Sequence, residues 1–255
     1  MPDTQQKTTH FGFKTVAEDE KQGMVYNVFE KVAEQYDLMN DVMTGGMHRI
    51  WKDALIDWAA PPKHAGDYKH LDVAGGTADI AFRMLEKAGK NAHSTVCDIN
   101  EHMLKVGEKR AQQKPYKDRI EFTCGNAETL SFEDNHFDIY TIAFGIRNVT
   151  RMQVALEEAY RVLKPGGRFL CLEVSKMQVA AVEKLYDKIS LNLVPKIGEM
   201  IVGDGTPYKY LVESTRRFPD QETFAQMIKD AGFSHVDYRN YLGGVAAIHS
   251  GYKIG

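Results

Sequence analysis

The chain has 255 residues, of which 43% are hydrophobic and 26% charged, and this balance is ordinary for one α/β unit with a sizeable core. Its formal net charge of −3 argues against a dominant nucleic-acid surface, because proteins that bind phosphates usually carry a basic patch. The three cysteines, Cys97, Cys124 and Cys171, form no C-x-x-C pair, so we expect buried, free thiols and neither a zinc site nor a disulfide framework.

The N-terminal part of the chain is predicted to be helical. Its beginning carries neither a secretory signal nor the arginine-rich pattern of a transit peptide, and no stretch approaches the ~20 apolar residues that span a bilayer. We therefore expect a cytoplasmic protein that makes, at most, peripheral contact with a membrane. Apolar residues recur at helical spacing between Glu20 and Trp58, and Pro61-Pro62 ends this zone. We assign residues 1–60 to an N-terminal helical cap on the substrate side and 61–255 to the main domain.

Strand and helix signals alternate through the middle of the chain. Apolar runs predict strands at residues 70–74, 94–98, 120–124, 137–144 and 168–174. Amphipathic segments predict helices at residues 80–88, 103–113 and 154–163. This alternation favours a parallel, doubly wound sheet.

The C-terminal third follows a different pattern. Residues 179–202 predict one long helix with an apolar face, and residues 223–231 predict another. We interpret the segment from about 179 to 215 as a helical lid, and simple core packing of its apolar face is the alternative. Residues 236–241 and 245–252 flank Gly243-Gly244, which predicts an antiparallel hairpin at the edge of the sheet.

The loop after the first strand of the alternating region has the character of a ligand site. Gly75, Gly76 and Thr77 let the backbone turn sharply and approach a ligand closely at the carboxyl end of a strand. The glycines of the dinucleotide fingerprint are absent, so NAD is disfavoured. The carboxylate of Asp72 suits a cationic ligand better than a pyrophosphate. A tight turn with a purely structural purpose is the alternative.

The next three strand ends also carry ligand-type residues. Asp98 lies where a carboxylate can accept both ribose hydroxyls of an adenosine, and helix capping, which Asn100 could supply instead, is its alternative role. Asn126 and Ala127 follow the third strand, where an amide side chain and a backbone N–H could hold an adenine edge. The segment FGIRNV at residues 144–149 follows the fourth strand, where we expect the transferred group.

Together these motifs resemble those of the ubiquinone/menaquinone biosynthesis C-methyltransferases, from about Val25 to the C-terminus. One signature stretch is YDLMNDVMT at residues 36–44, followed by HRIWK at 48–52. The other is RVLKPGG at residues 161–167, which continues to EVS at 173–175, and the stretches 72–79 and 144–149 are also typical of the family. The resemblance implies an α/β fold: the Rossmann-like, seven-stranded sheet of class I methyltransferases, with helices on both faces and an N-terminal helical cap.

The resemblance also implies the chemistry. It implies S-adenosylmethionine as the cofactor, with Thr77, Asp98, Asn126 and Ala127 among its contacts. The implied substrate is a polyprenyl benzoquinol or naphthoquinol, methylated on a ring carbon. Thr44 keeps the hydroxyl of the family's usual serine. Ala78 replaces a usual glycine, and we expect its methyl group to tighten or displace the methionine moiety of the cofactor.

Three residues are candidates for catalysis. Arg147 is expected to stabilise the phenolate that forms when the quinol loses a proton, and because arginine is always protonated it is not expected to act as a simple base. A salt bridge that closes the strand end is its alternative role. His48 has a suitable ordinary pKa for a proton shuttle, against the alternative of a packing residue. Tyr36 is expected to contact the methionine end of the cofactor or to cap a helix interface. No metal is expected, because no His, Cys and carboxylate side chains cluster at ligand spacing.

Two other functions stay open at this point. One is a class I methyltransferase that acts on another acceptor, such as a phospholipid amine. The other is a non-catalytic scaffold that binds cofactor or lipid within a quinone-synthesis complex. A prenylated quinol is the expected ligand beside the cofactor, no nucleic acid is expected, and association with other quinone-biosynthesis enzymes or as a homodimer is left open.

Overall fold

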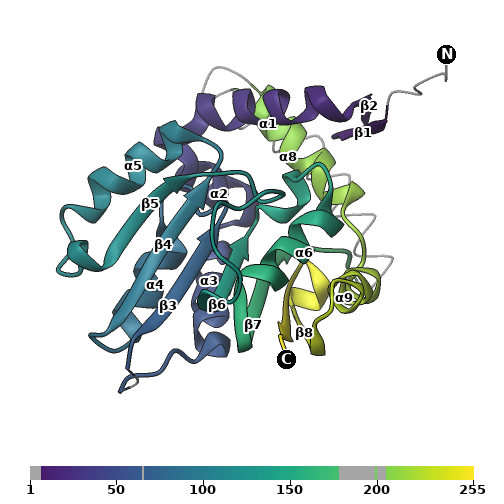
Figure 1. Ribbon diagram of the computed structural model, residues 1–255. Coiled ribbons are helices and arrows are strands. Elements are labelled where there is room, and N and C mark those ends of the chain that lie inside the picture. Colours follow the sequence, from purple (N-terminus) through teal and green to yellow (C-terminus); the bar gives the residue numbers. More distant parts are fainter. Residues whose placement is uncertain (1–6, 65, 178–198, 200–204) are drawn as a thin grey trace, which may run out of the picture.

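The computed structural model describes residues 7–64, 66–177, 199 and 205–255 (Figure 1). A seven-stranded sheet runs through it in the order β5-β4-β3-β6-β7-β9-β8. Five strands are parallel, and β9 runs antiparallel to both β7 and β8, which confirms the predicted sheet with its C-terminal hairpin. The strands are β3 (Tyr68–Val73), β4 (Ala92–Asp98), β5 (Ile120–Cys124), β6 (Phe137–Ala143), β7 (Leu163–Val174), β8 (Ser234–Tyr241) and β9 (Ala246–Tyr252).

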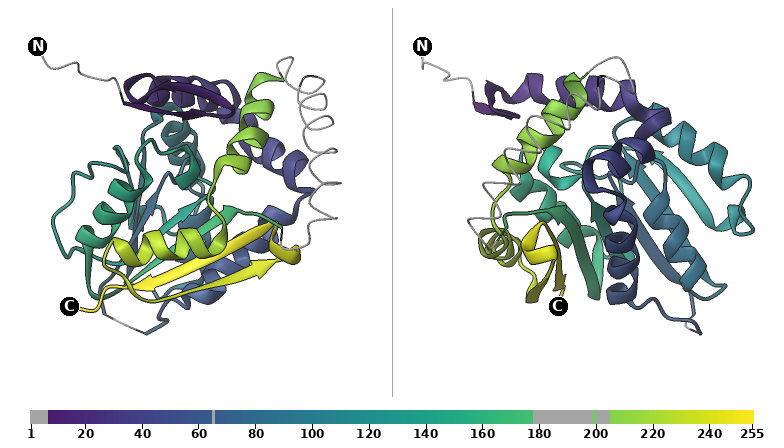
Figure 2. Two further views of the ribbon diagram at one scale, coloured as in Figure 1. Left: turned by 90° about the vertical axis from the view of Figure 1, so that its right-hand side faces the viewer. Right: turned by 180° about the vertical axis from the view of Figure 1, so that it is seen from behind.

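Helices cover both faces of this sheet (Figure 2). Buried side chains of α3 and α4 pack on one face of the central strands, and α5 extends this layer over β4 and β5. Buried side chains of α6 and α9 pack on the opposite face. The helices are α3 (Met47–Ala59), α4 (Asp79–Lys87), α5 (Glu101–Ala111), α6 (Met152–Val162) and α9 (Gln221–Asp230).

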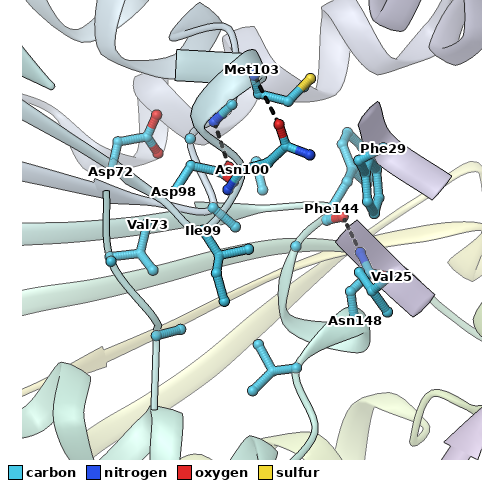
Figure 3. A pocket seen from close by; sticks show the side chains of 18 of the residues that line it. Val25, Phe29, Asp72, Val73, Asp98, Ile99, Asn100, Met103, Phe144 and Asn148 are labelled. Atoms are coloured by element: carbon cyan, nitrogen blue, oxygen red, sulfur yellow. Dashed lines mark hydrogen bonds between the residues drawn. The ribbon is translucent and has the colours of Figure 1, made fainter. Parts of the chain in front are cut away.

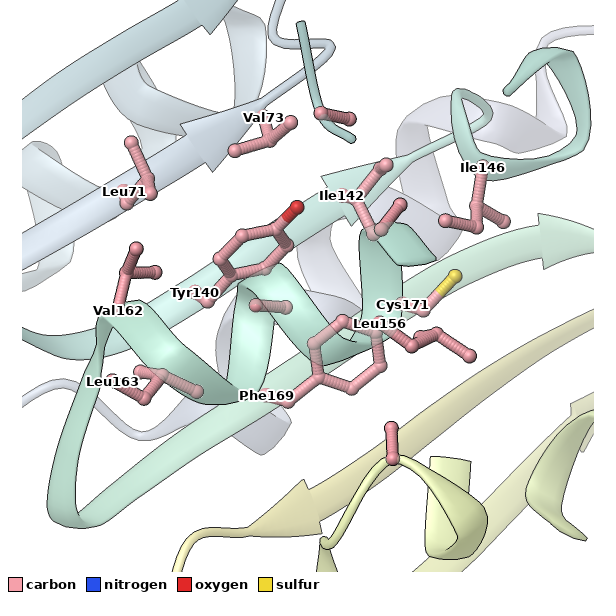
Figure 4. Packing of buried hydrophobic residues seen from close by; sticks show 14 of the residues in the cluster. Leu71, Val73, Tyr140, Ile142, Ile146, Leu156, Val162, Leu163, Phe169 and Cys171 are labelled. Carbon is pink, nitrogen blue, oxygen red and sulfur yellow. The ribbon is translucent and has the colours of Figure 1, made fainter. Parts of the chain in front are cut away.

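The alternation of side chains along the strands decides what each face carries. Leu71, Val73, Tyr140, Ile142 and Phe169 belong to the apolar layer on the α6 side (Figure 4). Because successive side chains of a strand point to opposite faces, the residues between them point toward α3 and α4. Some of those positions hold polar side chains, and part of the candidate active site is built from them.

The N-terminal segment folds over the carboxyl ends of the parallel strands. It contains a hairpin of β1 (Thr8–Phe11) and β2 (Lys14–Ala17), followed by α1 (Glu18–Val32) and α2 (Tyr36–Thr44). Apolar side chains of α1 and α2 pack against α8 (Thr206–Arg217), and Figure 1 shows α1 and α8 crossing above the sheet. Short 3-10 turns complete the described elements at Ala33–Gln35, Lys117–Arg119, Ile146–Asn148 and Leu242–Gly244.

Several expectations from the sequence differ from the structure. The hairpin β1–β2 was not predicted, because its two four-residue strands show no apolar run. Strand β7 begins at Leu163 directly after α6, whereas the sequence predicted that the strand begins only at residue 168, and the register slips beside Phe137. Gly166 at this irregularity has a φ of 83° and donates its backbone N–H to the Lys253 carbonyl. The helix α8 was not predicted as a separate element.

Three further expectations concern single features. The long helix expected at residues 179–202 lies outside the described residues, apart from residue 199. All three cysteines are free, as expected, but Cys124 is exposed at the end of β5, so the prediction that every thiol is buried was wrong. No helix among the described residues has both the length and the apolar character that crossing a bilayer requires.

Candidate active site

A pocket opens at the carboxyl ends of β3, β4, β5 and β6 (Figure 3). Eight of the ten residues that the sequence analysis selected line it: Tyr36, Asp72, Gly75, Gly76, Thr77, Asp98, Asn126 and Ala127. The other two, His48 and Arg147, are not among its lining residues. The neighbouring ends of parallel strands therefore gather most of the predicted site in one place.

The loop between β3 and α4 makes a tight turn at the floor of this pocket. A Cβ atom on Gly75 would lie 2.8 Å from a carboxylate oxygen of Asp72 and 2.8 Å from Val96, so only glycine fits. The N–H of Ala78 donates to the Gly75 carbonyl over 2.8 Å and closes the turn. Two alanines of this loop, Ala74 and Ala78, have positive φ angles, which is the kind of backbone strain that gathers at ligand sites.

Asp98 ties this loop to the beginning of α5. Its two carboxylate oxygens accept backbone N–H groups of Gly76 (2.9 Å) and Asn100 (2.8 Å). Burial raises the pKa of Asp98 to about 6, and the backbone hydrogen bonds oppose that rise. A carboxylate offers about four acceptor sites, so it can still accept ligand hydroxyls beside the two backbone groups. Asn100 caps α5 through the Met103 N–H (3.0 Å), which relieves Asp98 of that task.

Unlike Asp98, Asp72 accepts its hydrogen bond from a side chain. Its Oδ1 accepts the hydroxyl of Thr141 over 2.7 Å, and its buried Oδ2 has no partner among the described residues. Burial raises the pKa of Asp72 to about 7, and the Thr141 hydrogen bond and the charge of Lys52 oppose the rise. An unpartnered carboxylate oxygen in a pocket wall is suited to a cationic ligand.

Lys52 of α3 was missed by the sequence analysis. Its ammonium donates to Asp79 over 2.9 Å at the beginning of α4, and the residue is 4% exposed in the pocket lining. The signal was available, because a lysine on the apolar face that carries Trp51 and Leu55 is seldom buried without a partner or a ligand. Lys52 and Asp72 give one end of the pocket a cation and an anion, which matches an amino-acid moiety.

The opposite end of the pocket is bounded by the loop after β5. The Asn126 side chain accepts the Glu128 N–H over 2.9 Å, so its amide oxygen first stabilises its own turn. Glu128 in turn accepts the N–H groups of Thr150 and Arg151, both over 3.0 Å. The ammonium of Lys21 from α1 donates to the Val149 carbonyl over 2.9 Å. The N-terminal helix is thus fastened to the rim of the site.

The N-terminal helix also supplies pocket residues that the sequence analysis missed. Gln22, Val25, Tyr26 and Phe29 of α1 line the pocket, and the Asn100 amide donates to the Tyr26 carbonyl over 3.3 Å. Their helical periodicity was visible, but periodicity alone does not distinguish a pocket wall from core packing. Ile99 and Met103 are further lining residues that were not predicted, whereas Phe144 and Asn148 lie in the segment 144–149 where the transferred group was expected (Figure 3).

Arg147 lies beside the pocket and is paired with a carboxylate. Its guanidinium donates to Glu173 at the end of β7, and the two side chains are 5% and 1% exposed. This pair is the salt bridge at the strand end that the sequence left as an alternative. Arg147 Nε and Glu173 Oε2 have no partner among the described residues, so a buried donor and acceptor are left over. Burial raises the pKa of Glu173, and the charge of Arg147 opposes the rise.

His48 connects two helices of the N-terminal segment. Its Nε2 lies 2.8 Å from Oδ1 of Asp41, and its backbone N–H donates to the hydroxyl of Thr44. The ring is buried, and burial, opposed by the Asp41 hydrogen bond, lowers its pKa. The geometry thus shows a hydrogen-bonding residue that fixes α2 against α3, and the hydroxyl of Thr44 serves the same junction.

The methyl group of Ala78 does not lie where its expected effect on the cofactor would require. The group belongs to the apolar cluster between α4, α5 and β4, and Ala78 is not among the pocket-lining residues. The expectation that this methyl group crowds the methionine moiety was therefore wrong. The residue has φ 69° and ψ 21°, a left-handed conformation that costs an alanine about 1–2 kcal/mol relative to glycine.

Ala78→Gly is therefore expected to change the free energy of unfolding by less than about 1 kcal/mol. Relief of the left-handed strain offsets the loss of about 0.8 kcal/mol of methyl burial and the added freedom of the unfolded chain. Ala81 is the matched control, since it is equally buried but lies inside α4 in a right-handed conformation. Ala81→Gly should cost about 1.5–2 kcal/mol in urea denaturation. Equal losses in the two variants would contradict the proposed strain.

Among the described residues, no three His, Cys, Asp or Glu side chains lie close enough together to hold a metal ion. The charged residues of the pocket lining are instead four carboxylates and one ammonium: Asp72, Asp79, Asp98, Glu128 and Lys52. This donor set offers hydrogen-bond acceptors for hydroxyls and opposite charges for a zwitterion. It is suited to holding a nucleoside that is joined to an amino acid.

Comparisons with known proteins agree with this geometry. The model of the ubiE/COQ5 methyltransferase family matches residues 14–253. The ubiquinone/menaquinone biosynthesis C-methyltransferase UbiE of Brucella abortus (strain S19) is 59% identical over 244 residues, which cover 96% of this chain and 90% of that protein. A SAM-dependent methyltransferase of Thermotoga maritima shares the fold with a TM-score of 0.63 at 19% identity, over 90% of this chain and 99% of that one. Phosphoethanolamine N-methyltransferase 2 of Haemonchus contortus, solved with S-adenosyl-L-methionine, has a TM-score of 0.59 at 15% identity. The match covers 80% of this chain and 52% of that one.

Proposed function

Because the chain belongs to the ubiE/COQ5 methyltransferase family, we propose that it methylates a ring carbon of a polyprenyl benzoquinol or naphthoquinol. It is an S-adenosylmethionine-dependent C-methyltransferase with the class I, Rossmann-like fold. The observation that carries the proposal is the 59% identity, over 96% of the chain, to an enzyme named for ubiquinone and menaquinone biosynthesis.

The residues of the pocket fit the cofactor at three points. When it is bound, S-adenosylmethionine supplies an electrophilic methyl group on a sulfonium cation. Asp72, with its unpartnered oxygen, and Lys52 would hold the charged methionine end. The turn at Gly75 leaves no room for a side chain, so backbone can approach the ligand, and Asp98 would accept the ribose hydroxyls. Asn126 and Ala127 bound the place left for the adenine, and Tyr36 stays assigned to the methionine end.

The quinol that accepts the methyl group must first be made nucleophilic. A ring carbon of a quinol becomes nucleophilic when a hydroxyl ortho or para to it loses its proton, so negative charge develops on oxygen. Arg147 is assigned to stabilise that charge, because its buried Nε is a donor without a partner and a buried donor left unsatisfied costs about 1–3 kcal/mol. Glu173 holds the guanidinium in place from the other side. His48 bonds to Asp41 and lies outside the pocket lining, and its role as a proton shuttle stays a prediction.

The elements around the pocket fit the same proposal. The proposed helical cap, residues 1–60, contributes residues of α1, α2 and α3 to the pocket wall, and apolar side chains of α1 and α2 pack on α8 within the segment proposed as a lid. Because a polyprenyl tail partitions into a bilayer, the proposed substrate fits the expectation of a cytoplasmic enzyme that makes peripheral contact with the membrane surface. Association as a homodimer or with other quinone-biosynthesis enzymes stays a prediction.

Quinone profiling of cells that lack this protein tests the proposed substrate. We expect the C-methylated benzoquinone, naphthoquinone or both to disappear and their demethylated precursors to accumulate. The wild-type chain should restore the profile, and the Asp98→Ala variant should restore it poorly. Unchanged quinone pools, together with the loss of a methylated phospholipid, would instead favour a methyltransferase with another acceptor.

A further inference from the structure

Four polar side chains form a continuous hydrogen-bonded chain on the face of the sheet that packs against α3 and α4. Ser94 of β4 lies 2.8 Å from Nδ1 of His70 in β3, and Nε2 of His70 lies 2.8 Å from the hydroxyl of Thr141 in β6. Thr141 then donates to Asp72 over 2.7 Å. All four side chains are at most 1% exposed. The chain thus crosses the three central strands inside the core and ends at the pocket.

The direction of the hydrogen bonds follows from the number of protons. Thr141 has one hydroxyl proton and gives it to Asp72, so its oxygen accepts from Nε2 of His70. The ring is neutral, because burial lowers the pKa of His70 to about 3, and its Nδ1 therefore accepts the hydroxyl proton of Ser94. Three successive donors thus point toward one carboxylate, and hydrogen bonds aligned in this way strengthen one another.

If the hydrogen bonds ran in the opposite direction, one hydroxyl proton would lack an acceptor. That direction would need a protonated Asp72 that donates to Thr141, and His70 would then donate to Ser94. The hydroxyl proton of Ser94 would be left without an acceptor among the described residues. The arrangement of the chain consequently favours the ionised carboxylate at its end.

Other charges also face Asp72, and they have opposing effects on its pKa. Lys52 of α3 lowers the pKa, whereas Asp79 of α4 and Asp98 of β4 raise it, as burial does most strongly. Cys97 and Tyr140 are the remaining titratable neighbours, and burial raises the pKa of both, so they stay neutral. The hydrogen-bonded chain and Lys52 therefore act together to keep a deeply buried carboxylate charged.

We propose that His70 is a positioning residue for cofactor binding, which acts through Thr141 to hold Asp72 ionised with its free oxygen available to the cationic end of S-adenosylmethionine. This inference rests on the proposed function, because it requires a cationic cofactor in the pocket. His70 itself lies outside the pocket lining, so its effect is transmitted by the hydrogen bonds alone.

The test is the pH dependence of cofactor affinity, measured by calorimetry with S-adenosylmethionine between pH 6 and pH 8. In the His70→Leu variant the pKa of Asp72 should rise by about one unit, the size expected when a hydrogen bond to the charged form is weakened. The ratio of the dissociation constants, variant to wild type, should then be about ninefold at pH 6 and about twofold at pH 8. Titration of the cofactor's own amino group and of Asp98 is common to both proteins and cancels in this ratio.

Three further variants separate positioning from mere packing. His70→Gln supplies both N–H donors and a carbonyl acceptor, so it can bond to Thr141 and Ser94 and should return the pH profile toward that of the wild type. Ser94→Ala removes only the first donor and should shift the profile in the same direction by a smaller amount, which decides the question if the leucine variant does not fold. His249 is the matched control, because it is also a fully buried histidine of the sheet, and its ring has one hydrogen-bond partner among the described residues, the Gln221 carbonyl. His249→Leu should lower the melting temperature and leave the pH profile unchanged.

The measurements distinguish a failure of the positioning role from a failure of the proposed function. Folded His70→Leu and Ser94→Ala variants with the wild-type pH profile would overturn the positioning role and leave the proposed function intact. A wild-type protein that does not bind S-adenosylmethionine at any pH would overturn the proposed function itself.

Discussion

Arg147→Ala is expected to lower kcat about a hundredfold to a thousandfold and to leave the affinity for S-adenosylmethionine nearly unchanged. The reason is that a donor aimed at a developing phenolate matters most in the transition state, and Arg147 does not line the cofactor pocket. Arg147→Lys should recover only part of the loss, because an ammonium does not reproduce the planar guanidinium that pairs with Glu173. Single-turnover rates and calorimetric dissociation constants on the same samples measure the two effects.

The buried ion pair determines the controls for this variant. Removal of Arg147 alone leaves the Glu173 carboxylate buried without its cation, which typically costs about 3–5 kcal/mol of stability. The double variant Arg147→Ala/Glu173→Gln removes that charge, and Glu173→Gln alone measures the effect of the partner. We expect the double variant to regain stability and to stay slow. A stable double variant with near-normal turnover would show that the pair only closes the strand end and that another group stabilises the phenolate.

Asp98→Ala is expected to weaken cofactor binding by about 1.5–3 kcal/mol, or roughly tenfold to 150-fold. The carboxylate is proposed to accept the ribose hydroxyls, and it also joins the Gly76 and Asn100 N–H groups on two sides of the pocket. Because burial raises the pKa of Asp98 to about 6 and that of Asp72 to about 7, the wild-type affinity should fall as the pH drops through both values, and the part due to Asp98 should be missing in the Asp98→Ala variant. Calorimetry at pH 7.5 and pH 5.5 measures both effects.

A second carboxylate serves as the control for structural damage. Asp138 of β6 likewise accepts a backbone N–H from a neighbouring strand, that of Lys69 over 2.8 Å, but it is not among the pocket residues. Asp138→Ala should lower the melting temperature and leave cofactor affinity unchanged. If a folded Asp98→Ala protein binds the cofactor as tightly as the wild type, Asp98 does not anchor the ribose.

The alternating strands and helices of the sheet were predictable because each has a strong local signal. Short apolar runs end at Ala74 and Asp98, where small or polar residues begin the ligand loops, and β5 was predicted with the bounds that the structure shows. The same signals located the cofactor side of the pocket, since the order of parallel strands brings successive loops to one edge. These inferences need only neighbours in sequence.

What could not be predicted depends on contacts between distant elements. The pair of Arg147 with Glu173, the contact of His48 with Asp41 and the burial of Lys52 all require knowledge of how helices and strands pack. The chain from Ser94 through His70 to Thr141 likewise exists only in the register of three strands. A histidine in an apolar strand gives no sign of its partners, because periodicity specifies the face of the sheet and not the neighbouring side chain.

Transfer of a deuterium-labelled methyl group from S-adenosylmethionine to a short-chain prenyl quinol tests the central claim most directly. The purified wild-type protein is incubated in parallel with a reduced benzoquinol, a reduced naphthoquinol and a phospholipid amine, and the products are analysed by mass spectrometry and NMR. The account predicts that the label appears on a ring carbon of at least one quinol and that the phospholipid stays unlabelled. Label on a quinol oxygen or on the phospholipid amine, or cofactor binding without transfer to either quinol, would contradict it.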